Sequence, residues 1–260
     1  MRKKVHAKAC DPEHDRECRE KPSMFLPESK LFIHAHIIAW GYNGHMFQTE
    51  IYRQIKEEIG DGVQLCAVSK MHPEEEIQAA YALGQRMFGE NKAAELVRKA
   101  EALPKDIEWH FIGHLQRNKV RTILPYVTLI QSLDSLRLAK EIEKEAAKLN
   151  KTADCLLEVH LAEADTNKTG LAPEEAASLL AECQNLPHVH IIGMMAMGPH
   201  TEDEAEITRV FKRGQSLFSE LKNQYPDLCI LSMGMSDDYP LAIAAGANMI
   251  RIGSILFNGE

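Results

Sequence analysis

Lys70 is the residue of this sequence whose type and position best suit covalent chemistry. It closes a short apolar run, residues 64–70, and Pro73 with three glutamates follows it, a pattern typical of a helix start. An amine at the end of a buried strand has apolar surface behind it, and the lost hydration favours its neutral form. A neutral amine can attack an aldehyde to form a Schiff base. The alternative, from position alone, is a solvated lysine at a strand end.

Two later segments carry groups that could bind an anion. They follow the last two apolar runs of the chain, and their candidate residues are Ser232, Met233, Gly234, Ser236, Gly253 and Ser254. Glycine lets backbone N–H groups approach an anion closely, and serine hydroxyls add donors. Such residues are common in loops, but together with a lysine suited to an aldehyde they describe a site for pyridoxal 5′-phosphate (PLP), which carries both an aldehyde and a phosphate.

Arg251 is a candidate for contact with the ring of such a ligand. It lies two residues before Gly253 and so points to the same side of its strand, toward the interior. A guanidinium there could donate to the ring nitrogen, which would keep that nitrogen unprotonated and weaken the ring as an electron sink. Because an interior arginine needs an acceptor, a salt bridge to an inward carboxylate such as Glu90 or Glu158 is the alternative.

Asn91 and His110 complete the candidate cofactor site. Asn91 follows an apolar run that ends at Glu90; it could hydrogen-bond the cofactor, although capping the next helix is the commoner role of Asn at such a position. His110 lies in the third apolar run, where it could face the ligand or be a core histidine with satisfied hydrogen bonds. None of the candidate residues is assigned as catalytic or as a metal ligand.

The elements that must position these residues alternate between strand and helix. Eight apolar runs are predicted strands: residues 64–70, 86–90, 108–113, 128–132, 155–161, 189–195, 229–232 and 249–253. Helical periodicity separates them, most clearly in residues 207–221, and another helix, residues 47–59, precedes the first strand. The pattern predicts a parallel sheet, closed as a (β/α)8 TIM barrel in one domain, residues 46–260. The active face of that fold lies at the C-terminal strand ends, where the candidates fall.

The first 45 residues differ from the rest of the chain. They combine a charged opening with a short apolar patch, residues 31–40, which contains two histidines and is too short to cross a membrane. Four side chains that can bind metals recur every four positions: His6, Cys10, His14 and Cys18. The usual zinc spacings are absent. We interpret residues 1–45 as a non-native or disordered N-terminal extension, with Met46 as the biological start.

Composition restricts the class of partner. The chain has 260 residues, 45% hydrophobic and 26% charged, with a net charge of −8. An acidic chain without a basic stripe argues against binding to nucleic acid or anionic membranes, and no run approaches the roughly 18 apolar residues of a membrane span. The six cysteines are scattered without a CxxC pair, as expected of reduced thiols in a cytoplasmic protein. A small ligand is therefore the expected partner.

Five segments carry a family resemblance: residues 67–70 (AVSK), 88–91 (FGEN), 109–119 (WHFIGHLQRNK), 231–237 (LSMGMSD) and 251–253 (RIG). They resemble the signature segments of the pyridoxal phosphate homeostasis protein family (YggS/PROSC-type proteins), and the resemblance covers essentially residues 46–257. It implies a barrel similar to the N-terminal domain of alanine racemase, with PLP as an imine on Lys70 and Arg251 facing the pyridine nitrogen. The residues implied around the phosphate are Ser232, Ser236, Gly253 and Ser254.

Three features depart from the family pattern and bear on how the pocket is covered. Lys92 stands where the family usually has an aromatic residue after the Asn. Ser254 replaces the more usual Thr and keeps the hydroxyl. The C-terminal residues 257–260 (FNGE) lack the customary glycine after Phe and the arginine nearby.

The resemblance implies a protein that binds and supplies PLP in intracellular vitamin B6 homeostasis without established catalysis, with apo PLP-dependent enzymes as partners. A racemase needs an acid or base group on each face of the cofactor. The extra β-domain that provides the second group in alanine racemase is expected to be absent here, which also favours a monomer. One alternative is a single-domain racemase with His110 or Tyr239 as second base. The other is a PLP-free aldolase that uses Lys70 on a phosphorylated sugar.

Overall fold

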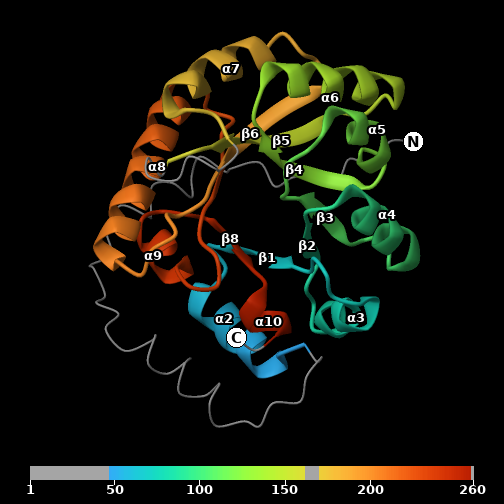
Figure 1. Ribbon diagram of the computed structural model, residues 1–260, viewed down its shortest axis with the longest axis vertical. Coiled ribbons are helices and arrows are strands. Elements are labelled where there is room, and N and C mark those ends of the chain that lie inside the picture. Colours follow the sequence, from blue (N-terminus) through green and yellow to red (C-terminus); the bar gives the residue numbers. More distant parts are fainter. Residues whose placement is uncertain (1–46, 162–169, 259–260) are drawn as a thin grey trace. The chain divides into compact units, whose positions relative to one another are not determined.

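The computed structural model describes residues 47–161 and 170–258 (Figure 1). Strands and helices alternate along this part of the chain. The elements are α2 (Thr49–Ile59), β1 (Gln64–Val68), α3 (Glu74–Ala82), β2 (Met87–Glu90), α4 (Ala93–Ala102), β3 (Glu108–Phe111), η2 (Arg117–Lys119), α5 (Val120–Ile123), β4 (Val127–Leu133), α6 (Leu136–Lys148), β5 (Ala153–Val159), η3 (Pro173–Glu175), α7 (Ala176–Cys183), β6 (Val189–Ala196), α8 (Glu204–Gln224), β7 (Ile230–Ser232), α9 (Tyr239–Ala244), β8 (Met249–Ile252) and α10 (Ser254–Phe257). The predicted alternation is confirmed.

The strands form one closed barrel in which neighbours along the chain are also neighbours in space. Every pair is parallel. The barrel closes where β1 pairs with β8, with Cys66 opposite Arg251 and Ala67 opposite Ile252. The larger helices surround the ring of strands (Figure 1). This is the predicted (β/α)8 TIM barrel, and the C-terminal ends of its strands meet at one mouth.

The barrel interior has an apolar layer and a polar layer. The apolar layer is a cluster of buried side chains: Leu129, Leu156, Ile192, Met195 and Met249. On β4 and β8 the next position on the same face toward the mouth is polar, because Gln131 follows Leu129 and Arg251 follows Met249 at a spacing of two residues. The strands therefore place hydrogen-bonding groups between the apolar filling and the mouth.

The C-terminal end of β1 differs from its predicted end. β1 ends at Val68 rather than at Lys70. The chain turns there, since the His72 N–H donates to the Ser69 carbonyl at 3.1 Å. Met71 takes a left-handed backbone conformation, with φ of 67°. The sequence pattern could not reveal this turn, because Ser69 and Lys70 continue the alternation of a strand.

Two helices begin where a side chain caps the first turn. α6 follows Ser135, one of the two predicted caps, whose hydroxyl accepts from the Leu138 N–H at 3.3 Å. α8 begins before the predicted residue 207, because the Asp203 carboxylate accepts from the Ala205 N–H at 2.9 Å. Local capping thus lengthened the helix beyond its apolar stripe.

Some predictions concern membranes, metals and the N-terminal segment. Among residues 47–161 and 170–258, no helix is both long enough and apolar enough to cross a bilayer. In the same residues, no three His, Cys, Asp or Glu side chains gather as a metal site. Residues 1–45, including the four candidate metal ligands, lie outside the described residues. Their interpretation as an extension, and residues 46–260 as one domain, stay predictions.

Candidate functional site

The mouth of the barrel brings together candidate residues that are far apart in the sequence. β7, β8, β1 and β2 are successive neighbours around the closed sheet. The segments that follow them contain Ser236, Ser254, Lys70 and Asn91, respectively. Because parallel strands end on the same side, these segments line one arc of the mouth.

Lys70 lies at the mouth, but it is exposed rather than buried. The predicted desolvation of its amine is therefore wrong for the described structure, because the chain leaves the barrel wall at Val68 and turns before Lys70. The exposed amine is accessible to an aldehyde from solvent. Its role as a covalent anchor stays a prediction, now resting on access and position.

Glycine is required at two positions in the loops around the mouth. At Gly234 the backbone φ is +93°, and a Cβ would lie 2.7 Å from the Ala242 Cβ. At Gly253 a Cβ would lie 3.1 Å from both the Cβ and the carbonyl oxygen of Val68, across the junction of β8 with β1. A side chain at either position would push its neighbours aside.

Two hydroxyls meet above these glycines. The Ser254 hydroxyl donates to the Ser236 hydroxyl at 3.0 Å, and Ser254 is exposed. The two loops therefore present adjacent hydroxyl groups to solvent on backbone that only glycine permits. Hydroxyl donors beside closely approaching backbone suit an anionic group such as a phosphate.

Ser232 and Met233 lie inside the protein rather than on the mouth surface. Met233 is fully buried, and its N–H donates to the Met249 carbonyl at 3.1 Å. The Ser232 hydroxyl donates to Gln131 Oε1 at 2.8 Å and accepts from Arg251 at 2.7 Å. Both residues thus support the mouth loops from below, and their predicted contact with the cofactor stays a prediction.

A chain of hydrogen bonds crosses the polar layer of the barrel. We call it the inner chain; its members are Arg251, Ser232, Gln131 and His110. Beyond Ser232, Gln131 Nε2 lies 3.0 Å from His110 Nδ1. Because the Gln131 oxygen accepts from Ser232, its nitrogen is the donor, and His110 Nδ1 accepts. Gln131 was missed in the sequence, although its spacing of two from the apolar Leu129 indicates an inward position.

His110 is a buried, neutral histidine. Burial lowers its pKa to about 4, because the charged imidazolium loses its hydration. With Nδ1 accepting from Gln131, the proton of the neutral ring is on Nε2. At neutral pH the ring can therefore donate from Nε2 but carries no charge. Its hydrogen bond fits the predicted alternative of a satisfied core histidine, and contact with the cofactor stays a prediction.

Arg251 lies inside the barrel, as predicted, and finds most of its acceptors on backbone. It donates to the Ser232 carbonyl at 2.9 Å and to the Ala196 carbonyl at 3.0 Å. The alternative of a salt bridge to Glu90 is wrong, because Glu90 lies on the other face of the wall with Lys99 at 2.8 Å. Burial lowers the pKa of Arg251, and Glu158 is among the charges that oppose this shift.

Asn91 carries an amide oxygen without a partner. Within the described ranges, 47–161 and 170–258, no donor lies in hydrogen-bond distance of its buried Oδ1. Asn91 does not cap the next helix, because the N-cap of α4 is Lys92. Its backbone is held against Gly113, where a Cβ would lie 2.5 Å from the Asn91 carbonyl oxygen. A fixed acceptor without a partner at the mouth suits ligand binding.

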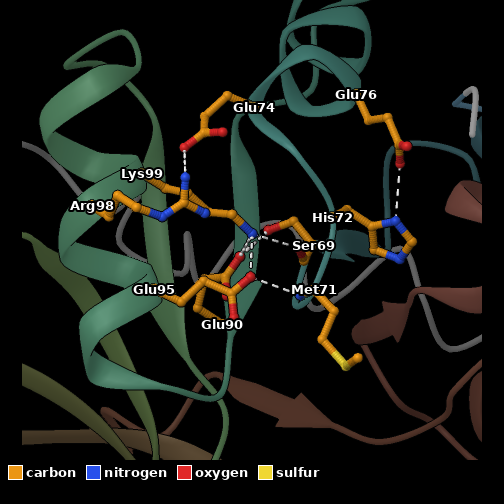
Figure 2. A network of polar contacts seen from close by, with 9 residues as sticks. All are labelled: Ser69, Met71, His72, Glu74, Glu76, Glu90, Glu95, Arg98 and Lys99. Atoms are coloured by element: carbon orange, nitrogen blue, oxygen red, sulfur yellow. Dashed lines mark hydrogen bonds and ion pairs between the residues drawn. The ribbon is translucent and has the colours of Figure 1, made fainter.

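A second polar network lies behind the wall, between β1, β2 and α4 (Figure 2). We call it the outer cluster; its members are Ser69, Glu90, Glu95 and Lys99. The Lys99 side chain is 0% exposed, and its Nζ lies 2.8 Å from Oε1 of both Glu90 and Glu95. The sequence interpretation missed Lys99. The signal was its place one turn from the buried Leu96 and Leu103 on the same helix face.

Tyr239, one of the two candidate second bases, faces a helix. Its side chain is buried, and its hydroxyl donates to Glu58 of α2 at 2.8 Å. Burial and this carboxylate raise the pKa of Tyr239. A phenol that donates to a carboxylate is a poor proton acceptor, so the geometry gives no support to Tyr239 as a catalytic base.

Comparison with known proteins relates this geometry to a family. Residues 49–260 match the family model for the alanine racemase N-terminal domain. A pyridoxal phosphate homeostasis protein from Helicobacter pylori is 44% identical over 198 residues, which are 75% of this chain and 87% of that protein. PipY from Synechococcus elongatus, in its structure with PLP bound, is 37% identical with a TM-score of 0.74, over 80% of this chain and 99% of that one.

Alanine racemase itself shares the fold at much lower identity. The enzyme from Clostridium difficile is 18% identical with a TM-score of 0.68, over 79% of this chain and 55% of that chain. The match to this enzyme is therefore one of fold alone, whereas the relatives above 35% identity match along nearly their whole length. The chain belongs to the pyridoxal phosphate homeostasis protein family, whose barrel is that of the alanine racemase N-terminal domain.

Proposed function

We propose that this protein binds PLP as a Schiff base on Lys70 and acts in intracellular PLP homeostasis. The observation that carries the proposal is the exposed Lys70 amine on the same arc of the mouth as the Ser236 and Ser254 hydroxyls. Relatives named as PLP homeostasis proteins and the PLP-bound structure of PipY support the same ligand.

The residues at the mouth fit the functional groups of PLP. The lone pair of unprotonated Lys70 Nζ bonds to the aldehyde carbon, and the aldehyde oxygen leaves as water. Ser236 and Ser254 offer hydroxyls to the phosphate, and Gly253 lets the phosphate approach the backbone. The Asn91 Oδ1 that lacks a partner offers an acceptor to a donor on the ligand. Each of these groups is an accessible or unpartnered feature of the described structure.

The buried groups below the mouth would tune the ring. Arg251 is the cation of the polar layer and would face the pyridine nitrogen. A guanidinium in that place keeps the nitrogen unprotonated, and an unprotonated ring is a weak electron sink. This arrangement suits storage and delivery of the cofactor better than reactions at the α-carbon of an amino acid.

The proposal includes the absence of a dedicated catalytic activity. The relatives are named as homeostasis proteins rather than as enzymes. The two candidate second bases support this view, because Tyr239 donates to Glu58 and His110 has its pKa lowered to about 4 by burial. A racemase would exchange the α-hydrogen of an amino acid with solvent deuterium, and we expect no exchange above that of free PLP.

We further propose a cytoplasmic monomer that passes PLP to apo PLP-dependent enzymes. The support for the compartment is the set of buried free thiols: Cys66, Cys155 and Cys183. Burial raises the pKa of Cys66 to about 12, so this thiol is unreactive at neutral pH although it lies opposite Arg251. Size-exclusion chromatography with light scattering tests the monomer, and reactivation of an apo-enzyme by the PLP-loaded protein tests the transfer.

The first test is an absorption spectrum with added PLP, before and after borohydride. Wild type should show a yellow band that reduction converts to a stable adduct on Lys70, identified by peptide mass spectrometry. Lys70→Ala should lose both, whereas Lys92→Ala, which removes another exposed lysine at the mouth, should keep both. Equal adduct formation in wild type and Lys70→Ala would contradict the anchor. A sugar imine, by contrast, would give no yellow band.

A further inference from the structure

The outer cluster contains a lysine with no exposed surface and two carboxylates. Lys99 Nζ donates to the Ser69 carbonyl at 2.7 Å, besides its bonds to Glu90 and Glu95. Burying an ammonium group is costly unless hydrogen bonds and opposite charge compensate it, and here all three donors of Lys99 have acceptors. A structure maintains such a group where its contacts specify one arrangement.

Three contacts of the outer cluster end on the two residues that flank Lys70. Ser69, on one side, has its carbonyl bound by Lys99, and its hydroxyl donates to Glu90 at 2.6 Å. Met71, on the other side, donates its N–H to Glu95 at 2.7 Å. Figure 2 shows these bonds converging on the turn from α4 and β2. The cluster therefore holds the peptide units before and after Lys70, while leaving the Lys70 side chain free.

The backbone of this turn requires such support. Met71 has a positive φ of 67°, and its side chain is 79% exposed, so side-chain packing contributes little to holding it. For a residue with a side chain the left-handed conformation costs roughly 1–2 kcal/mol. Strained backbone persists only where the surroundings determine it, and it is frequent at ligand sites. The Glu95 carboxylate bound to the Met71 N–H provides that determination.

The charges of the cluster agree with this arrangement. Burial alone would raise the pKa of Glu95, but the hydrogen bonds from Lys99 and from the Met71 N–H lower it. Glu95 is therefore an anion when it binds the turn, and hydrogen bonds to charged acceptors are the stronger ones. Burial raises the pKa of Glu90, while Lys99 and Ser69 oppose that shift.

We propose that Lys99 and Glu95 are positioning residues that set the Ser69–Met71 turn and thereby aim Lys70 at the ligand. The inference rests on the proposed role of Lys70 as the PLP anchor. Neither residue touches the cofactor; both act through the backbone on either side of Lys70. Their loss should loosen the turn first and weaken covalent PLP binding as a consequence.

The experiment uses the full-length protein with three variants and a matched control. Lys99→Met removes the ammonium group. Glu95→Ala removes the acceptor of the Met71 N–H, and Glu95→Gln keeps an acceptor there without the charge. Lys151→Met is the control, because Lys151 Nζ also donates to two backbone carbonyls, at 2.9 and 2.6 Å, but near the start of β4, at the opposite end of the barrel.

The first readout is hydrogen exchange of the Met71 amide in protein freed of PLP. Lys99→Met and Glu95→Ala should raise its exchange rate at least about tenfold, because the hydrogen bond that protects it is weakened or lost. Glu95→Gln and Lys151→Met should stay within about twofold of wild type. Unchanged exchange in Glu95→Ala would overturn the proposal directly.

The second readout is PLP itself, titrated into each protein and fixed by borohydride. Lys99→Met and Glu95→Ala should weaken apparent PLP affinity about tenfold and shift the pH midpoint of the yellow band, since a displaced amine loses its reactive geometry. Glu95→Gln should recover most of the loss. Equal PLP binding in Lys99→Met and Lys151→Met would contradict a positioning role.

Failure of the proposed function is distinguishable from failure of this inference. If wild type fixes no PLP on Lys70, the proposed function fails, and the exchange of the Met71 amide still decides whether the outer cluster holds the turn. If Lys99→Met does not fold, the pair Glu95→Ala and Glu95→Gln decides alone, because Glu95 is partly exposed on α4 and its loss leaves the Lys99–Glu90 pair in place.

Discussion

The inner chain and the outer cluster lie on opposite faces of the barrel wall, and both are largely buried. The inner chain has one charged member, Arg251, and its hydrogen bonds run from donor to acceptor through neutral groups to His110. The outer cluster has two carboxylates and one ammonium within 2.8 Å contacts. The same depth of burial is thus satisfied once mainly by neutral groups and once by charges.

This difference sets what each network loses when one member is removed. In the inner chain a deleted side chain leaves a neutral partner without one hydrogen bond, a cost of about 1–3 kcal/mol. In the outer cluster a deleted ammonium leaves a buried carboxylate without compensation, which costs about 3–5 kcal/mol. The outer cluster should therefore be the more sensitive of the two, and the comparison can be tested by substitution.

The largest expected effect is that of Lys99→Met on stability. We expect the free energy of unfolding at pH 7 to fall by about 3–5 kcal/mol, measured by urea denaturation, because Glu90 is left buried and charged. The loss should shrink as the pH falls, since Glu90 then takes up a proton. The double variant Lys99→Met with Glu90→Gln should recover part of the loss; no recovery would show that packing, rather than charge, is the cause.

The next effect is the pH dependence that His110 contributes. Its pKa falls from an ordinary value near 6.5 to about 4 in the folded protein. Between these values the unfolded chain binds a proton and the folded one does not, so stability is lost as the pH falls through this window. The loss should reach about 3 kcal/mol, at up to about 1.4 kcal/mol per pH unit.

The measurement is urea unfolding of wild type and His110→Gln at intervals between pH 7 and 4. Carboxylates also titrate near the lower end of this range, so the difference between the two proteins is the relevant quantity. Parallel pH profiles would contradict a neutral, buried His110 and would remove the terminal acceptor of the inner chain.

Ser232→Ala should have a smaller effect than either. The substitution removes the donor to Gln131 and one acceptor of Arg251, but Arg251 keeps the carbonyls of residues 232 and 196. We expect a loss of about 1–2 kcal/mol in urea denaturation. A loss as large as that of Lys99→Met would reverse the comparison between the two networks.

The smallest effect provides the reference for charges outside both networks. Arg53 and Glu50 form an ion pair on α2 at 2.6 Å, with side chains that are 59% and 77% exposed. Arg53→Gln should change the free energy of unfolding by less than about 0.5 kcal/mol. A change above 1 kcal/mol would mean that surface charge, rather than burial, governs these substitutions.

The fold was predictable from the sequence, because alternating strand and helix patterns leave few parallel architectures and short connections favour the barrel. The positions of Arg251 and the mouth glycines followed from strand periodicity. The exposure of Lys70 did not, since it depends on a turn fixed by Glu95, which is distant in the sequence. Gln131 and Lys99 were missed for the same reason, as their partners come from other elements.

The closure of the barrel between β1 and β8 restricts how another protein can recognise this one. An open sheet offers the unpaired N–H and C=O groups of its edge strands, to which a partner can add a strand of its own. Each of the strands β1 to β8 already has two neighbours. An enzyme that accepts the cofactor must therefore read side chains and loops, and the loops that carry Lys70, Ser236 and Ser254 are where recognition and delivery would coincide.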